Sequence, residues 1–560
     1  MLFRCVEYLN TMQLKFINHF SLLVFLLAAP FISVAEENES SESPASFEQT
    51  VAQFSKGSFK QKEATIQALS EINDERVLPV FKAMLASKLY YVKSNKQIVY
   101  FEKDGDDIRA TSVNTNQVLD ITEKRKLKKV SVNNKLRKIL RGHIAALSLK
   151  SPEVDVRVSA VNEIIKSVSE KEYQTLKELL KTEQEESVTE IIKIGIAMWE
   201  LDSEEQQTRL TAISNLTDSL LPEVRVKLAA LSEKSSSGEY IESDETVRRA
   251  ASKAVLLIDD RVSFFGFLDN VVFGLSLGSV LLLIAVGLAI TFGVMGVINM
   301  AHGELMMIGA YTAFVVQQIL PSHIGLSIFV AIPLAFIVSA AFGVAIERFV
   351  IRYMYGRPLE TLLATFGISL ILQQMVRVIF GPTNQAVETP PFMSGSLEIN
   401  PIFAITYNRL YIFIFSIAVL LTLIYILKRT RLGLQVRAVS QNRAIAKAMG
   451  IRSEWVDALT FGLGAGIAGI AGVALSQLTN VGPNLGQAYI IDSFMVVVFG
   501  GVGNLWGTFV AAMSLGVINK FLEPWAGAVL AKILVLVFII LFIQKRPRGL
   551  FPQKGRAAEN

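Results

Sequence analysis

Apolar runs of about 20 residues recur from Phe264 to Ile543, and polar residues dominate the chain before them. Each run is about as long as an α-helix must be to cross the hydrocarbon core of a membrane. The pattern predicts a mainly α protein with a polytopic bundle over residues 263–552 and a short tail over 553–560. About nine spans are expected: 269–292, 303–320, 324–346, 361–380, 409–427, 455–476, 488–502, 505–522 and 527–544. The seventh is short, and a re-entrant segment is the alternative for it.

Residues 36–262 are rich in Glu, Lys, Ser and Gln, which predicts a soluble, mostly helical domain before the bundle. Related phrases return at Val154, Val188 and Val224, at intervals of 34 and 36 residues. A period near 35 residues is typical of an α-solenoid, in which each helix pair buries its apolar face on the next. We therefore expect HEAT-like repeats.

One stretch of this domain, "KLYYVKSNKQIVYFEKDGDDIRATSV", alternates apolar and polar residues and contains an Asp-Gly pair. Alternation with period two predicts strands, and Asp-Gly favours a tight hairpin turn. A small β insertion is expected among the helices.

The first 35 residues carry sparse positive charge, an apolar stretch and the small residues Ser33 and Ala35 at the spacing of a cleavage site. This pattern predicts a secretory signal peptide over 1–35, with an uncleaved membrane anchor as the alternative. The single cysteine, Cys5, lies in this segment, so we expect no disulfide in the mature chain.

Basic residues gather in alternate loops of the bundle. Seven lie between Lys428 and Arg452 and five between Lys545 and Arg556, whereas the loop "GPTNQAVETPPFMSGSLEIN" has none. The positive-inside rule places the basic loops and the C-terminus in the cytoplasm and the domain over 36–262 outside. The formal net charge of +5 is modest, and the sequence contains no basic patch with aromatic residues among the basic ones. We therefore expect no nucleic-acid partner.

Polar side chains inside or beside the apolar runs are candidates for function, because burying them in hydrocarbon is costly. His302 and Glu304 lie where the first two runs meet, either at the inner membrane interface or deeper. An H-x-E pair without a third ligand does not predict a metal site. The candidates for a translocation path are Asn299, His302, Glu304, Gln373, Asp492 and Asn504.

The segment "KRTRLGLQVRAVSQNRAIAKAMGIRSEW" predicts a short amphipathic helix, with Val439, Ile445, Ala446 and Met449 on one side and Gly450 at its end. Two uses are open: the helix lies on the membrane surface, or it inserts into a groove of a cytoplasmic partner.

Three ordered motifs, "GLAITFGVMGVINMAHGELMMIGAY", "RAVSQNRAIAKAMGI" and "VVVFGGVGNLWGT", resemble the permease subunits of ABC importers of the branched-chain amino acid and amide family. The resemblance covers residues 266 to 552. It implies a multi-pass protein of a bacterial inner membrane that works with a second permease subunit, two ATPase subunits and a soluble substrate-binding protein. The domain over 36–262 departs from the minimal pattern of this family.

The same resemblance implies that residues 437–450 form the segment that couples the permease to the ATPase subunits. The residues concerned are Arg437, Asn442, Arg443, Ala446 and Gly450. The sequence has no G-x-x-x-x-G-K-[ST] loop to hold nucleotide phosphates, so we expect partner subunits to use the ATP. We expect this chain to be a transporter subunit with no bound cofactor, and not an enzyme.

The ending "FLEPWAGAVLAKILVLVFIILFIQKRPRGLFPQKGR" resembles the B-type permease of urea transporters. Urea is a small neutral amide, so a path for it needs scattered hydrogen-bonding groups without a salt-bridging pocket. The alternatives are a permease for branched-chain amino acids or short amides, and a membrane-anchored sensor with an external ligand-binding domain.

Overall fold

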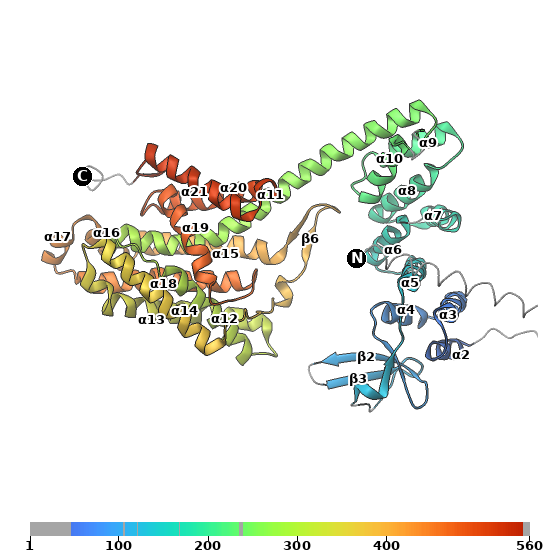
Figure 1. Ribbon diagram of the computed structural model, residues 1–560, viewed down its shortest axis with the longest axis horizontal. Helices are drawn as coiled ribbons and strands as arrows, with labels where there is room; N and C mark the ends of the chain where they lie inside the picture. Colours follow the sequence, from blue (N-terminus) through green and yellow to red (C-terminus); the bar gives the residue numbers. More distant parts are fainter. Residues whose placement is uncertain are drawn as a thin grey trace, which may run out of the picture. The chain divides into compact units, whose positions relative to one another are not determined.

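The computed structural model describes residues 46–104, 107–119, 121, 123–166, 168–234 and 239–552 (Figure 1). It is mainly helical, as predicted, and it contains the small sheet expected among the helices. The predicted signal peptide over 1–35 and tail over 553–560 lie outside the described residues. The chain forms two compact units, Met1–Ile164 and Ile165–Asn560.

The first unit consists of short helices with a five-stranded antiparallel sheet inserted after α4. Its strand order is β4-β3-β2-β1-β5, and Tyr90 of β1 pairs with Val99 of β2. The core contains Phe54, Phe81 and Leu140, all fully buried. The elements are α2 (Phe47–Ala52), η1 (Gln53–Ser55), α3 (Phe59–Glu71), α4 (Val77–Leu85), β1 (Leu89–Val92), β2 (Ile98–Asp104), β3 (Asp107–Ser112), β4 (Val118–Leu119), η2 (Lys124–Lys126), β5 (Leu127–Lys129), α5 (Asn134–Ser148) and α6 (Val154–Ile165).

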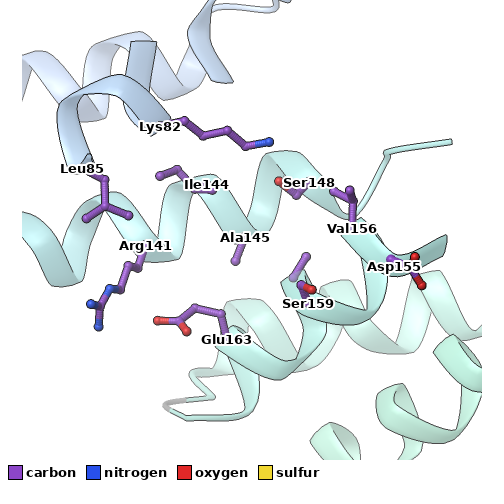
Figure 2. Close-up of a pocket in the computed structure, with 11 residues that line it drawn as sticks. Lys82, Leu85, Arg141, Ile144, Ala145, Ser148, Asp155, Val156, Ser159 and Glu163 are labelled. Atoms are coloured by element: carbon purple, nitrogen blue, oxygen red, sulfur yellow. The ribbon is translucent and has the colours of Figure 1, made fainter. Parts of the chain in front are cut away.

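A hollow of about 450 Å³ lies between α4, α5 and α6 of this unit (Figure 2). Leu85, Ile144 and Ala160 contribute apolar walls, and Lys82 and Glu163 are charged residues of its lining. It therefore offers an apolar floor with charges of both signs.

The second unit begins with four helices joined by short connections, followed by a helix of 51 residues, α11. Both α9 and α10 pack against α11. The predicted domain boundary at residue 262 falls inside α11, which runs without a break into the apolar sequence. The bounds are α7 (Glu170–Thr182), α8 (Glu186–Glu200), α9 (Gln206–Leu216), α10 (Pro222–Ser232) and α11 (Glu245–Met295). Their assignment to HEAT-like repeats stays a prediction.

Each of the nine predicted apolar runs falls largely within a helix. Among the described residues, seven helices are long and apolar enough to cross a membrane, namely α11, α13, α14, α15, α18, α20 and α21. The predicted seventh span, α19, has only 16 residues. The bounds are α12 (His302–Ile319), α13 (Ile324–Phe349), η3 (Ile351–Met354), α14 (Pro358–Phe380), η4 (Pro391–Met393), β6 (Ser396–Glu398), β7 (Ala404–Thr406), α15 (Tyr407–Arg429), α16 (Arg431–Gln441), α17 (Arg443–Ala448), α18 (Ser453–Ser476), α19 (Leu485–Gly500), α20 (Leu505–Ala526) and α21 (Ala528–Lys545).

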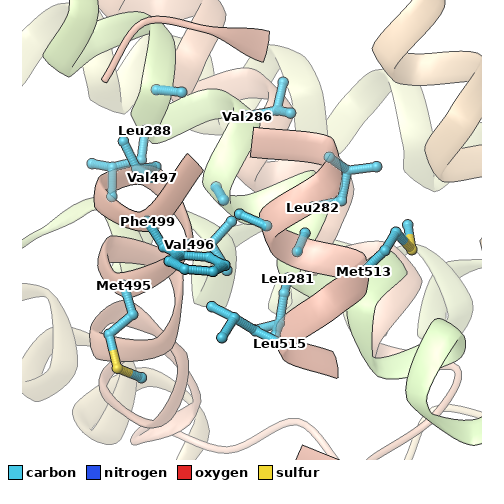
Figure 3. Packing of buried hydrophobic residues seen from close by; sticks show 14 of the residues in the cluster. Leu281, Leu282, Val286, Leu288, Met495, Val496, Val497, Phe499, Met513 and Leu515 are labelled. Carbon is cyan, nitrogen blue, oxygen red and sulfur yellow. The ribbon is translucent and has the colours of Figure 1, made fainter. Parts of the chain in front are cut away.

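Large apolar side chains fill the space between α11, α19 and α20 (Figure 3). Leu282 and Val286 of α11 lie in one buried cluster with Val496 of α19 and Leu515 of α20. Dispersion contacts of this kind hold membrane helices together, because lipid chains are as apolar as the side chains themselves.

Glycines govern the packing of α12. A Cβ atom at Gly309 would overlap the backbone of Gly469 in α18, and one at Gly303 would overlap the backbone of Gly486 in α19. Close backbone approach of this kind needs small residues at the crossing point. Helix α12 is therefore held between α18 and α19 with no room for side chains at these positions.

We expect Gly309→Val to destabilise the bundle, because the added methyl groups must push α12 away from α18. Overpacking costs about 1–3 kcal/mol in a core, and here the obstacle is backbone that cannot rotate aside. The melting temperature of the purified protein in detergent, followed by size-exclusion chromatography, measures the effect.

Gly367→Val is the matched control, since Gly367 is also inside a helix but has no atom within 4 Å of its added Cβ. Equal melting temperatures for the two variants would contradict the role of the Gly309 contact.

Candidate functional site

The α11–α12 connection leaves the helical path inside the bundle. Gly296 ends α11 in the left-handed conformation, with φ of 65°, and α12 begins at His302. Within this connection Val297, Asn299 and Ala301 are buried. Irregular backbone at membrane depth is tolerated where protein or a water-filled cavity surrounds it, and such breaks often border transport sites.

Glu304, in the first turn of α12, is buried and faces α14. Its Oε1 accepts hydrogen bonds from Ser369 Oγ at 3.1 Å and from Gln373 Nε2 at 2.8 Å. Its Oε2 has no hydrogen-bond partner among the described residues. Ser369 is the middle residue of α14, so Glu304 contacts the middle of an apolar helix and not its end.

One side of α14 is a polar stripe. Thr361, Thr365, Ser369 and Gln373 recur every four residues and are all buried, whereas Leu363, Ile371 and Val378 on the opposite side are exposed. Four-residue spacing places the stripe on one helix face. Thr365 Oγ1 accepts a hydrogen bond from the Met300 amide at 3.1 Å, so the stripe borders the α11–α12 connection.

Asn299 and His302 lie at the same connection and bond mainly to backbone. Asn299 Oδ1 accepts from the Ala301 amide at 3.0 Å, and His302 Nε2 lies 3.1 Å from the Ile284 carbonyl oxygen. Asn299 Nδ2 and His302 Nδ1 are buried without a hydrogen-bond partner in the described part of the chain. His302 faces α11, whereas Glu304, two residues further on, faces α14.

The other two candidates have different surroundings. Asp492 of α19 forms an ion pair of 3.0 Å with Lys532 of α21. Asn504 caps α20, since its Oδ1 accepts from the amides of Trp506 and Gly507, and its Nδ2 donates to the Phe551 carbonyl at 3.2 Å. Asn299, His302, Glu304 and Gln373 therefore share the α11–α12–α14 region, and Asp492 and Asn504 bond elsewhere.

The prediction of one amphipathic helix after α15 is wrong, because the segment forms two helices, α16 and α17. Asn442 interrupts it, ends α16 and caps α17 by accepting from the Ile445 amide at 3.0 Å. The predicted apolar face is also divided: Val439 and Ala446 are buried, but Ile445 is 61% and Met449 79% exposed. Gly450 follows α17 with φ of 85°, which agrees with its expected place at the helix end.

Arg443 fixes α17 to the bundle. It forms an ion pair with the buried Asp457 of α18, and its guanidinium carbon lies 4.5 Å from the centre of the Tyr355 ring. The Tyr355 hydroxyl donates a hydrogen bond of 3.1 Å to Glu347 of α13. Burial and the neighbouring Glu347 carboxylate raise the pKa of Tyr355 far above its ordinary value, so the hydroxyl stays protonated and donating.

Sequence reasoning missed Ser369, Tyr355, Asp457 and Glu347. The stripe over 361–373 was visible as small polar residues at spacing four inside an apolar run. The other three needed the fold, because their partners are 8 or more positions away.

We expect Arg443→Ala to destabilise the protein, because it leaves the Asp457 carboxylate buried and unpaired. Removing one partner of a buried ion pair costs about 3–5 kcal/mol, and the half-exposed arginine places this case near the lower end. Thermal unfolding of the purified chain in detergent checks this value.

Adding Asp457→Asn to Arg443→Ala removes the unpaired charge and is expected to restore part of the loss. Arg431→Ala, a change of an exposed arginine in α16, serves as the control. The explanation fails if Arg431→Ala and Arg443→Ala lower stability equally.

Comparison with known proteins covers the membrane part of the chain. Residues 270–543 match the family described as the permease component of branched-chain amino acid transport systems. The high-affinity branched-chain amino acid permease protein BraD of Pseudomonas aeruginosa is 32% identical over 295 residues, which are 51% of this chain and 96% of BraD.

LivH of Escherichia coli is 30% identical over 298 residues, with 51% of this chain and 96% of LivH covered. LivM of Salmonella typhimurium is 24% identical over 297 residues, with coverage of 48% and 67%. No solved structure matches the chain. From the match to nearly the whole of BraD and LivH, the chain belongs to the family of permease subunits of branched-chain amino acid ABC transporters.

Proposed function

We propose that this chain is the permease subunit of an ATP-driven importer and that the importer carries urea. The observation that supports a path at this place is the broken backbone over 296–301, which lies beside the buried polar stripe of α14. A membrane helix that buries four hydroxyl and amide side chains in a row offers a polar solute successive hydrogen bonds.

The chemistry around Glu304 suits a neutral amide. Its neighbours Ser369 and Gln373 are uncharged, and each offers both a donor and an acceptor. The free Glu304 Oε2 can accept from an amide NH₂ group, and the stripe can donate to its carbonyl oxygen. The ending of the sequence, with its resemblance to urea-type permeases, supports the same substrate.

A branched-chain amino acid is the second candidate, and two observations favour it. The similar permeases BraD and LivH are named for branched-chain amino acid transport. Arg377 also continues the polar stripe of α14 one turn beyond Gln373, so a carboxylate and a guanidinium border the same face. Arg377 donates to Asn484 Oδ1 at 2.7 Å, which leaves part of its guanidinium for a substrate carboxylate.

We propose that α16 and α17 receive the ATPase subunits. Ile445 of α17 and Met449, which directly follows α17, are exposed, as partner-facing residues must be. Ala446 packs inward with Val436, Val439 and Val456. Arg443 ties α17 to α18 through Asp457 and, by way of Tyr355, to Glu347 of α13. A push on α17 would therefore move these helices together and reach α12, which packs on both.

The arrangement in the membrane is part of the same proposal. The basic loops and α17 would lie in the cytoplasm of a bacterial cell, and residues 36–262 would lie outside, after removal of a signal peptide. A second permease subunit would complete the path, a soluble binding protein would deliver substrate, and two ATPase subunits would use ATP. A HEAT-like external domain would suit a docking role for one of these partners.

Uptake of labelled substrate tests the function. We expect cells that lack this gene to lose uptake of labelled urea at micromolar concentration, and the intact gene to restore it. Labelled leucine is the comparison substrate. Loss of leucine uptake instead would replace urea by the second candidate, and unchanged uptake of both would contradict the importer.

Two variants at position 304 separate the substrates within the site. Glu304→Ala removes both hydrogen bonds to α14 and is expected to lower uptake roughly tenfold, as for the loss of hydrogen bonds to a charged group. Glu304→Gln keeps an acceptor for Ser369 and Gln373 but removes the charge. A urea path is expected to tolerate this change, because a neutral amide needs no counter-charge.

Glu398→Ala, at an exposed position in β6, is the control for expression and assembly. Full urea uptake by Glu304→Ala would remove Glu304 from the path. Loss of uptake in Glu304→Gln at normal assembly would contradict the neutral-amide site and favour a substrate with an ammonium group.

A further inference from the structure

A second cavity, of about 720 Å³, opens at the end of the bundle that carries α16. Its walls come from the ends of α11, α15 and α20, from α16, and from residues 550–552. It shares Arg437 and Asn504 with the candidates above but none of the residues around Glu304. The proposal drawn from it does not depend on which substrate the protein carries.

The cavity has an apolar part and a polar part. Ile290 of α11 and Ile424 and Leu427 of α15 belong to helices that cross the membrane. Lys428 lies in the last turn of α15, and Arg437 lies in the middle of α16, the polar helix that follows it. We infer that both cations are near the membrane surface, because basic residues at the end of an apolar helix prefer that level. A ligand that fills this space must be apolar at one end and polar at the other.

The charge of the lining selects the polar end. Lys428 and Arg437 are its two cationic residues, and no acidic side chain is among the described residues that line it. Neither cation has a carboxylate partner in the described part of the chain, and Arg437 bonds through Nε only to the Gly433 carbonyl of its own helix. The polar group that fits is therefore an anion.

The cavity is within reach of the bilayer. Only 22% of the most apolar stretch of α15 is buried, so this helix is on the periphery of the bundle. Trp506, which also lines the cavity, is about half exposed, and tryptophan is favoured at the membrane–water interface. The cavity therefore has one wall from a helix at the periphery of the bundle and one aromatic residue typical of the membrane interface.

We propose that this cavity binds an anionic phospholipid, with the phosphate at Lys428 and Arg437 and the acyl chains against α11 and α15. A free phosphate ion would use the two cations but would leave the apolar walls exposed to water. An uncharged or zwitterionic lipid would fill the walls but would not balance both cations. The lipid phosphate would bridge Lys428 of α15 and Arg437 of α16, two helices that also pack on each other directly.

Tryptophan fluorescence tests the site, because Trp506 is inside it. The full chain, with Trp199, Trp455 and Trp525 changed to Phe, is placed in nanodiscs that contain brominated phosphatidylglycerol or brominated phosphatidylcholine. We expect phosphatidylglycerol to quench Trp506 more strongly at equal mole fraction. Inorganic phosphate is added as a competitor and is expected to leave the quenching unchanged.

The double variant Lys428→Gln and Arg437→Gln is expected to lower the preference for phosphatidylglycerol over phosphatidylcholine roughly tenfold. The reason is that each basic side chain near an anionic lipid contributes to the electrostatic attraction. Arg429→Gln with Arg431→Gln is the matched control, because these neighbours have the same charge but do not line the cavity. In a chain whose only tryptophan is Trp525, in the last turn of α20, we expect the two brominated lipids to quench the fluorescence equally.

Equal quenching of Trp506 by the two lipids would overturn the proposal, as would an equal loss of preference in the two double variants. Displacement by phosphate would assign the cations to a soluble anion instead. The measurement is repeated on the assembled transporter, where disappearance of the preference would assign the cavity to a protein partner and also overturn it. Helix content by circular dichroism confirms that each variant is folded.

Discussion

The bundle depends on the contact of bare backbone between α12 and its neighbours at Gly303 and Gly309. Without this approach the first turn of α12 could not lie deep among α11, α14 and α19, and its polar side chains would meet lipid. The contact thus helps to keep Glu304 and His302 buried inside the protein. Steric fit at two glycines supports a site whose groups would otherwise be costly to bury.

The two ends of α13 and α18 serve different tasks through the same packing. At one place they pack against α12, and near α17 they supply Glu347 and Asp457 to a network of ionic and aromatic contacts. Rigid helices can transmit a displacement from one end to the other, because a closely packed core moves as a unit and does not deform gradually. The same two helices therefore connect the α17 network to the packing of α12.

Apolar periodicity was sufficient to predict the helices, because each run must be long enough to cross a membrane. It also singled out Glu304 and Gln373 as polar residues in apolar runs, and the structure buries both and joins them by a hydrogen bond; their place in a path stays a prediction. It failed at Asn442, because an amide that caps a new helix overrode the amphipathic pattern on both sides. Asp492 and Asn504 looked equivalent to Glu304 in sequence, but only the fold shows that Lys532 and a helix end use them.

The turn between α19 and α20 has a consequence for biosynthesis. The carbonyl oxygens of Phe499 and Gly500, at the end of α19, accept hydrogen bonds from the amides of Leu550 and Phe551. The Asn504 side chain donates a hydrogen bond to the Phe551 carbonyl, 47 positions later in the chain. These bonds cannot form until α21 has been made and has entered the membrane. The ribosome therefore releases α19 and α20 with their junction unfinished, and residues 550–551, which are synthesised after α21, complete it.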